Sequence, residues 1–104
     1  MKIQVNTDHN IHGHEGTIDQ IEATVGATLG HLSEHITRVE VHVSDENAKK
    51  GGSTDKRCMM EARLEKHQPI AVTEEAATLD GAVDGAAHKL KRLLDHTLGR
   101  LSEN

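Results

Sequence analysis

The sequence Arg38-Val39-Glu40-Val41-His42-Val43-Ser44 decides the fold class of this chain. Valines alternate with polar residues along it, and successive side chains of a β-strand point to opposite faces. The three valines therefore share one face of a predicted strand, and the polar residues share the other. Such a strand is typical of a sheet that has one face against a core and the other in water.

Three further segments show the same alternation. Lys2 to Thr7 predicts a short strand, and Arg57 to Lys66 predicts a longer one. Pro69 precedes a fourth strand, because proline is tolerated at a strand start or a sheet edge. The segment from Asp45 to Asp55 is rich in Lys, Gly and Ser and predicts a mobile hairpin loop. The inward residues of these three strands are Ile3, Val5, Cys58, Met60, Ala62, Leu64, Ile70 and Val72.

Two segments have the period of an amphipathic helix. The first helix is predicted to begin between His14 and Thr17, because residues 17–20 have the form of a capping box. The second is predicted from about Thr78 to Leu101. In both, apolar residues recur every three or four positions, as they do on the core-facing side of a helix. They are Ile18, Ile21, Val25, Leu29 and Leu32 in the first helix, and Leu79, Ala82, Val83, Ala86, Leu90, Leu93, Leu94 and Leu101 in the second.

The order strand–helix–strand–strand–strand–helix indicates an α+β protein. Two helices with single apolar faces and four half-polar strands predict a two-layer sandwich, in which both helices cover one face of a four-stranded sheet. The 104 residues fit a single domain, residues 1–104. Its core must be aliphatic, because the chain has no Phe, Tyr or Trp. We therefore expect modest stability, or support from a partner or from a second copy in a homodimer.

Composition limits the classes of partner. The formal net charge is −5, and a globally acidic chain binds nucleic acid poorly, because phosphate contacts need local positive potential. No Lys or Arg occurs between Ile3 and Thr37, so any anion-binding surface must come from the second half of the chain. Nothing resembles a signal peptide or a membrane span, and the single Cys58 excludes an internal disulfide. We expect a cytoplasmic protein with no membrane partner.

The second predicted helix carries the strongest candidate site, a row of basic residues. Lys89, Arg92, His96 and Arg100 recur at intervals that place them along one flank, and Lys91 lies on the opposite flank. Such a row can bind the phosphates of a nucleic-acid strand. It is more often the pattern of a solvated helix with cations near its C-terminus, where the helix dipole favours positive charge.

Cations also flank the predicted loop, where they could contact a second anionic strand. Acidic residues lie among them, so a flexible loop of mixed charge is the more common interpretation. The cations are Lys49, Lys50, Lys56 and Arg57, and the acidic residues are Asp45, Glu46 and Asp55.

Catalysis and cofactor binding find no support in the sequence. His9, His12 and His14 are weak candidates for a metal site, because His-x-His can bring two imidazoles to one ion. No Cys lies nearby, however, and the spacing matches no structural zinc pattern. Cys58 falls on an inward strand face, where a buried and inert thiol is expected. We predict neither a cofactor nor an enzymatic activity.

Residues 82–94 read Ala-Val-Asp-Gly-Ala-Ala-His-Lys-Leu-Lys-Arg-Leu-Leu. They resemble the last-helix signature of the ribosome hibernation-promoting factor and ribosome-associated inhibitor A family, whose short members include sigma-factor modulation-like proteins. That signature reads roughly Ala-Ile-Asp, four residues, Lys-Leu, one residue, Arg, one residue, Leu. The resemblance extends over nearly the whole chain, because the order of elements is also the family's, and that fold is related to double-stranded-RNA-binding folds. The signature's fixed positions are filled by Asp84, Lys89, Leu90, Arg92 and Leu94.

The resemblance implies a translation inhibitor or hibernation factor that binds the small ribosomal subunit in the channel for mRNA and the tRNA anticodon arms. Lys89 and Arg92 match the family's cations for rRNA phosphates, and His96 stands where a Lys is usual. Family members usually carry several Lys or Arg along the first helix, and this chain carries none there. A second interpretation stays open: a divergent member that acts as a protein-interaction or regulatory module, its acidic first helix facing a basic partner.

Overall fold

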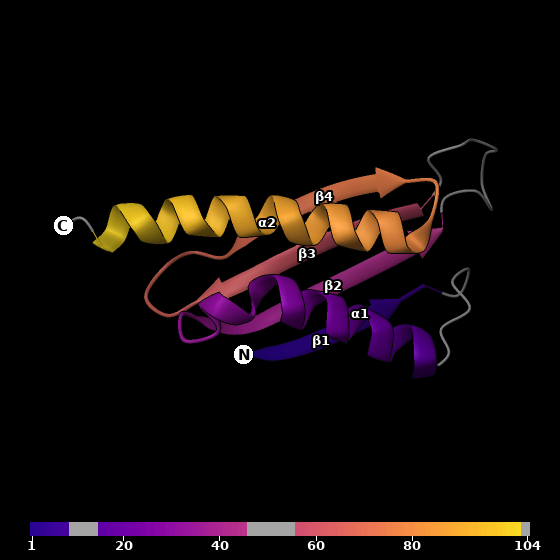
Figure 1. The fold of residues 1–104 in the computed structure, drawn as a ribbon, viewed down its shortest axis with the longest axis horizontal. Coiled ribbons are helices and arrows are strands. Elements are labelled where there is room, and N and C mark those ends of the chain that lie inside the picture. Colours follow the sequence, from indigo (N-terminus) through magenta and orange to yellow (C-terminus); the bar gives the residue numbers. More distant parts are fainter. Residues whose placement is uncertain (9–14, 46–55, 103–104) are drawn as a thin grey trace.

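A computed structural model describes residues 1–8, 15–45 and 56–102, and it confirms the predicted α+β order of elements (Figure 1). The predicted loop between the second and third strands lies mostly in residues 46–55, outside the described residues. The elements are β1 (Lys2–Thr7), α1 (Glu15–Leu29), a short 3-10 helix η1 (Gly30–Leu32), β2 (Ile36–Asp45), β3 (Lys56–Leu64), β4 (Ile70–Ala76) and α2 (Leu79–Ser102).

The four strands form one sheet in the order β1-β2-β3-β4. β1 pairs with β2 in parallel, which requires a crossover connection, and α1 lies within it. The pairs β2–β3 and β3–β4 are antiparallel. Rows of paired residues cross the sheet and alternate between its faces. One inward row is Val5, Val41, Met60 and Val72, and the next row, on the opposite face, is Asn6, His42, Met59 and Thr73.

Both helices cover the same face of the sheet, as predicted (Figure 1). α2 packs on β3 and β4, α1 packs beside β1, and the two helices contact each other. They run in the same direction, so their N-terminal halves lie at the same end of the molecule (Figure 1). None of the described helices lies on the other face of the sheet, and we call it the open face.

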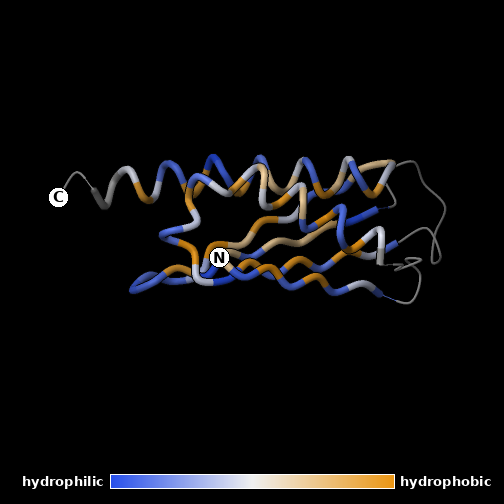
Figure 2. The backbone as a smooth tube through the Cα atoms, turned by 60° about the horizontal axis from the view of Figure 1, so that its bottom comes forward, coloured by the Kyte–Doolittle hydropathy of each residue, from blue (hydrophilic) through white to orange (hydrophobic). Residues whose placement is uncertain are grey.

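The core lies between the helices and the sheet and is entirely aliphatic. Apolar and polar residues alternate along the strands (Figure 2), and the buried apolar residues of the strands form one core with those of the helices. Val25, Met60 and Leu90 are fully buried, and they come from α1, β3 and α2. No polar or charged residue in the described part of the chain is buried. Three alanines of α2 join this core, and their small side chains allow close packing. They are Ala82, Ala86 and Ala87.

α1 begins at Glu15, within the range predicted for its start, so Thr17 lies inside its first turn and the predicted capping box is wrong. The sequence patterns misplaced the ends of two strands. β2 begins at Ile36, whose buried side chain extends the core beyond the predicted strand. β3 ends at Leu64, and Lys66, with a backbone φ of 58°, belongs to the turn that follows.

The prediction that Leu93 belongs to the apolar face of α2 is also wrong, because its side chain is 42% exposed. Gly81 lies near Ala76, and Gly85 lies near Glu74, so α2 runs back along β4 toward the start of that strand. Because β4 is the edge strand of the described sheet, none of the described strands lies beyond it to cover this flank of α2 at Leu93.

Candidate nucleic-acid interface

α2 holds the predicted basic row at the surface of the helical layer. The hydroxyl of Thr78 accepts a hydrogen bond of 3.0 Å from the N–H of Gly81, which satisfies one of the free donors at the helix start. Because one side of the helix is buried against the sheet, its cations lie on the flanks. Lys89 lies on the flank next to β4, and Lys91 lies on the flank next to η1, so the predicted separation of these two residues is confirmed.

Lys89 is held by the neighbouring strand. Its ammonium donates to the carbonyl oxygen of Thr73 at 2.9 Å and lies 3.0 Å from a carboxylate oxygen of Glu74. The Glu74 carboxylate in turn packs against Gly85, where an added Cβ would lie only 2.6 Å from Glu74 Oε2. The glycine therefore allows the carboxylate to reach Lys89. This arrangement ties α2 to β4 and compensates the charge of Lys89 within the molecule.

Lys91 is also paired within the protein. Its ammonium donates to Asp95 Oδ2 at 3.2 Å, one helical turn away, and His31 Nε2 of η1 lies 3.3 Å from Asp95 Oδ1. Partial desolvation acts to raise the pKa of Asp95, but the hydrogen bonds from Lys91 and His31 outweigh it and lower the pKa. This cluster joins η1 to α2 at the surface, where ion pairs contribute little to stability.

Arg92 and His96 are the residues of the row that stay available. Both are exposed, and within the described part of the chain neither makes a hydrogen bond or an ion pair. Leu93 lies between them on the helix surface and is itself exposed. We call these three residues the Arg92 flank. The side chain of Arg100, one turn further along, lies outside the described part of the structure.

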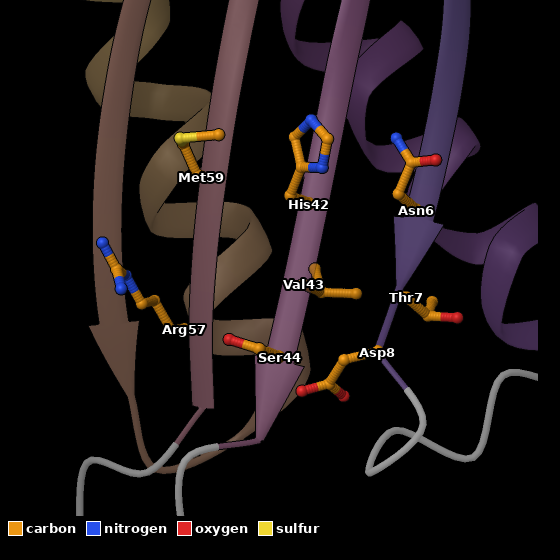
Figure 3. Close-up of a pocket in the computed structure, with 8 residues that line it drawn as sticks. All are labelled: Asn6, Thr7, Asp8, His42, Val43, Ser44, Arg57 and Met59. Atoms are coloured by element: carbon orange, nitrogen blue, oxygen red, sulfur yellow. The ribbon is translucent and has the colours of Figure 1, made fainter.

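The two described cations next to the predicted loop, Lys56 and Arg57, do not extend the Arg92 flank. Lys56 begins β3, and its ammonium lies 3.5 Å from Asp45 Oδ2. Arg57 projects from the open face of the sheet, on the side of the molecule opposite α2 (Figure 3). Lys49 and Lys50 lie outside the described residues. The predicted basic residues that the structure describes are thus divided between two faces of the molecule.

The N-terminal halves of α1 and α2 enclose an acidic groove of about 340 Å³. Asp80 and Asp84 of α2 line one side, and Gln20 and Thr24 of α1 line the other. The exposed residues of α1 include Asp19 and Glu22 as well, so the acidic character predicted for the first helix extends to its neighbour. A groove of this charge repels phosphate and attracts cations.

The open face contains a charge cluster that the sequence patterns missed. Glu40, whose side chain is only 16% exposed, receives a 2.8 Å hydrogen bond from Arg38 and lies 3.3 Å from Arg63 Nε. His42 Nε2 lies 3.8 Å from the other carboxylate oxygen of Glu40. Alternation along β2 placed Arg38, Glu40 and His42 on one face. The contribution of Arg63 depends on the pairing of β2 with β3, which no local pattern reveals.

Two further predicted features concern cysteine and histidine side chains. Cys58 is fully buried, and burial raises the pKa of its thiol to about 12, so the expectation of a buried, inert thiol is confirmed. His9, His12 and His14 lie outside the described residues. Among the residues that are described, no group of three His, Cys, Asp or Glu side chains could hold a metal ion. None of the described helices is long and apolar enough to cross a membrane.

Comparisons with known proteins find a matching family model and solved structures with the same fold. The model of the family described as "Sigma 54 modulation protein / S30EA ribosomal protein" matches residues 5–102. The N-terminal domain of Protein Y from Thermus thermophilus superposes with a TM-score of 0.74 at 18% identity, covering 93% of this chain and 99% of that one. A ribosomal subunit interface protein from Coxiella burnetii superposes with a TM-score of 0.74 at 16% identity, covering 95% and 99%. No curated protein matches the chain.

Proposed function

Because the chain belongs to the sigma 54 modulation protein / S30EA ribosomal protein family, we propose that it binds the small ribosomal subunit in the channel for mRNA and tRNA and inhibits translation as a hibernation factor. No chemical step is involved. The molecule measures about 48 × 25 × 19 Å, and a body of this size inhibits by occupying the space that mRNA and tRNA need.

The observation that carries this proposal is the Arg92 flank. Arg92 and His96 are exposed and unpaired in the described part of the chain, and they lie on the helix that carries the family signature. A guanidinium binds phosphate through paired hydrogen bonds, so Arg92 is the residue best suited to contact rRNA. Exposed Leu93 adds apolar contact area beside it.

Lys89 has a different role in this proposal. Its ammonium already contacts Glu74 and Thr73, so a phosphate would have to compete with both partners. Lys89 therefore acts mainly by holding α2 against β4, which keeps the Arg92 flank in position. Substitution of Lys89 by Glu is a poor test of RNA binding, since it would place two carboxylates together.

Sedimentation through a sucrose gradient at low and moderate salt tests the proposal. Wild-type protein should migrate with the small subunit, and Arg92→Glu should shift it to the top of the gradient, because the substitution reverses a charge at the rRNA contact. Arg63→Gln, which alters an exposed arginine on the open face, is the control and should migrate like the wild type. Wild-type protein that remains at the top at low salt contradicts the proposal.

The acidic groove favours a second candidate function, the binding of a basic protein segment. Asp80 and Asp84 face α1 across a groove in which the described residues include no cation. A Lys- and Arg-rich peptide should bind there with an affinity that falls as salt rises. Asp84→Lys should abolish this binding. A peptide that binds the wild type and Asp84→Lys equally contradicts this alternative.

A further inference from the structure

The open face of the sheet contains a pocket at the end where β1 and β2 finish (Figure 3). Its volume is about 350 Å³, within the range of small-molecule sites. Residues of three adjacent strands and the residue after β1 form it. The lining residues are Asn6, Thr7, Asp8, His42, Val43, Ser44, Arg57 and Met59.

The centre of the pocket offers a surface on which a flat ring can stack. His42 and Met59 are directly paired across β2 and β3, and both project from the open face (Figure 3). The imidazole of His42 is 43% exposed, and Met59 is 37% exposed. Nucleobases stack on histidine rings, and methionine sulfur makes favourable contacts with aromatic rings. In a chain without Phe, Tyr or Trp, this pair supplies a substitute for an aromatic platform.

Polar groups lie on both sides of this surface. Asn6, paired with His42 across β1 and β2, carries an amide that can both donate and accept hydrogen bonds to a base edge. Arg57 lies on the other side and makes no ion pair or hydrogen bond in the described part of the chain. Arg38 and Arg63, the other arginines of this face, are already held by Glu40. Arg57 is therefore the open-face arginine that can bind a phosphate.

Asp8 sets the orientation of such a ligand. Its side chain extends from the residue after β1 toward the end of β2, and Ser44 lies between its carboxylate and Arg57 (Figure 3). A carboxylate repels phosphate but accepts hydrogen bonds from hydroxyl groups. A phosphate therefore belongs at Arg57, and a sugar hydroxyl belongs toward Asp8.

We propose that this pocket binds a nucleotide, with the base on His42 and Met59, the base edge at Asn6 and the phosphate at Arg57. The ligand is either a free nucleotide or one unstacked nucleotide of a single-stranded RNA, since both present the same chemistry. The site lies on the face opposite α2, so it is independent of the Arg92 flank and goes beyond the proposed function.

Methyl NMR of protein labelled at the methionine methyl groups tests this site directly. Met59 lies in the pocket, whereas its neighbour Met60 is fully buried on the other side of the sheet and serves as an internal control. Addition of AMP or UMP should shift the Met59 signal and leave Met60 unchanged. A short oligouridylate that binds about tenfold more tightly than UMP identifies an RNA strand as the ligand, and equal affinities identify a free nucleotide.

Arg57→Gln and Arg63→Gln form a matched pair on the same strand and the same face. Arg57→Gln should weaken nucleotide binding about tenfold or more, because it removes a charge-assisted hydrogen bond to phosphate. Arg63→Gln, outside the pocket, should bind like the wild type. The proposal is overturned if Met59 does not shift at about 10 mM nucleotide, if inorganic phosphate binds as well as AMP and UMP, or if the two variants lose binding equally.

Discussion

Residues 89–90 and 92–93 of α2 repeat the same two residue types, a cation followed by a leucine, in opposite environments. Lys89 bonds to β4 and Leu90 is fully buried, whereas Arg92 is unpaired in the described residues and Leu93 is 42% exposed. Three residues along a helix turn the chain by about 300°, which leaves each residue of the second pair about 60° around the helix axis from its counterpart in the first. The first pair therefore holds the helix in place, and the second pair is free to contact a partner.

Substitution of the two leucines should give the largest difference in the free energy of unfolding. Leu90→Ala should lower the free energy of unfolding by about 2–5 kcal/mol, because it leaves a cavity in a closely packed core. Leu93→Ala should change it by at most about 0.5 kcal/mol, as expected for an exposed position. Urea denaturation measures both values. Similar losses in the two variants would show that a second copy or another surface covers Leu93 in solution.

The two cations should separate stability from binding. Lys89→Gln should lower the free energy of unfolding by about 1 kcal/mol, because it removes the ion pair with Glu74. Arg92→Gln should leave stability within about 0.5 kcal/mol of the wild type and weaken co-sedimentation with the small subunit. Glu74→Gln is the control for Lys89→Gln. The double variant should lose less free energy of unfolding than the sum of the losses in the two single variants. A Lys89→Gln variant as stable as the wild type would contradict the role of Lys89 in holding α2 against β4.

Substitution of Asp95, on the flank of α2 next to η1, should give the smallest change in the free energy of unfolding. Its folded-state pKa is lowered from the ordinary value of 3.8, so its ionised form stabilises the fold above that pH and the contribution is lost as the pH falls below it. Asp95→Asn should therefore be less stable than the wild type at neutral pH, by at most about 0.5 kcal/mol because the group is exposed. The difference should disappear below pH 3.8. An Asp95→Asn deficit that persists unchanged at lower pH would contradict this account.

The strands were predictable because their pattern is local. Val39, Val41 and Val43 are buried on one face as alternation predicted, and the same reasoning placed Cys58 and Met60 in the core. The end of an apolar helix face was less predictable. Leu93 has the right period for burial, but its exposure depends on where the edge strand β4 ends beneath α2.

For the candidate site, the sequence predicted which residues are basic but not which of them are paired within the protein. Spacing placed Lys89 and Arg92 on one flank, but the pairing of Lys89 depends on Glu74 and on the absence of a side chain at Gly85. These three residues meet only because α2 folds back along β4. The open-face pocket depends likewise on the register that brings His42, Met59 and Asn6 into one row. Interactions between distant segments decide which predicted residues are available to a ligand.

The parallel pairing of β1 with β2 has a consequence for how the chain reaches this structure. Lys2 pairs with Arg38, so during synthesis β1 leaves the ribosome well before β2, the strand with which it pairs. In contrast, β2, β3 and β4 form successive antiparallel hairpins, whose contacts are close in sequence and form quickly. We expect β1 to dock after the folding transition state, so substitutions at Ile3 or Val5 should mainly accelerate unfolding and leave the folding rate almost unchanged.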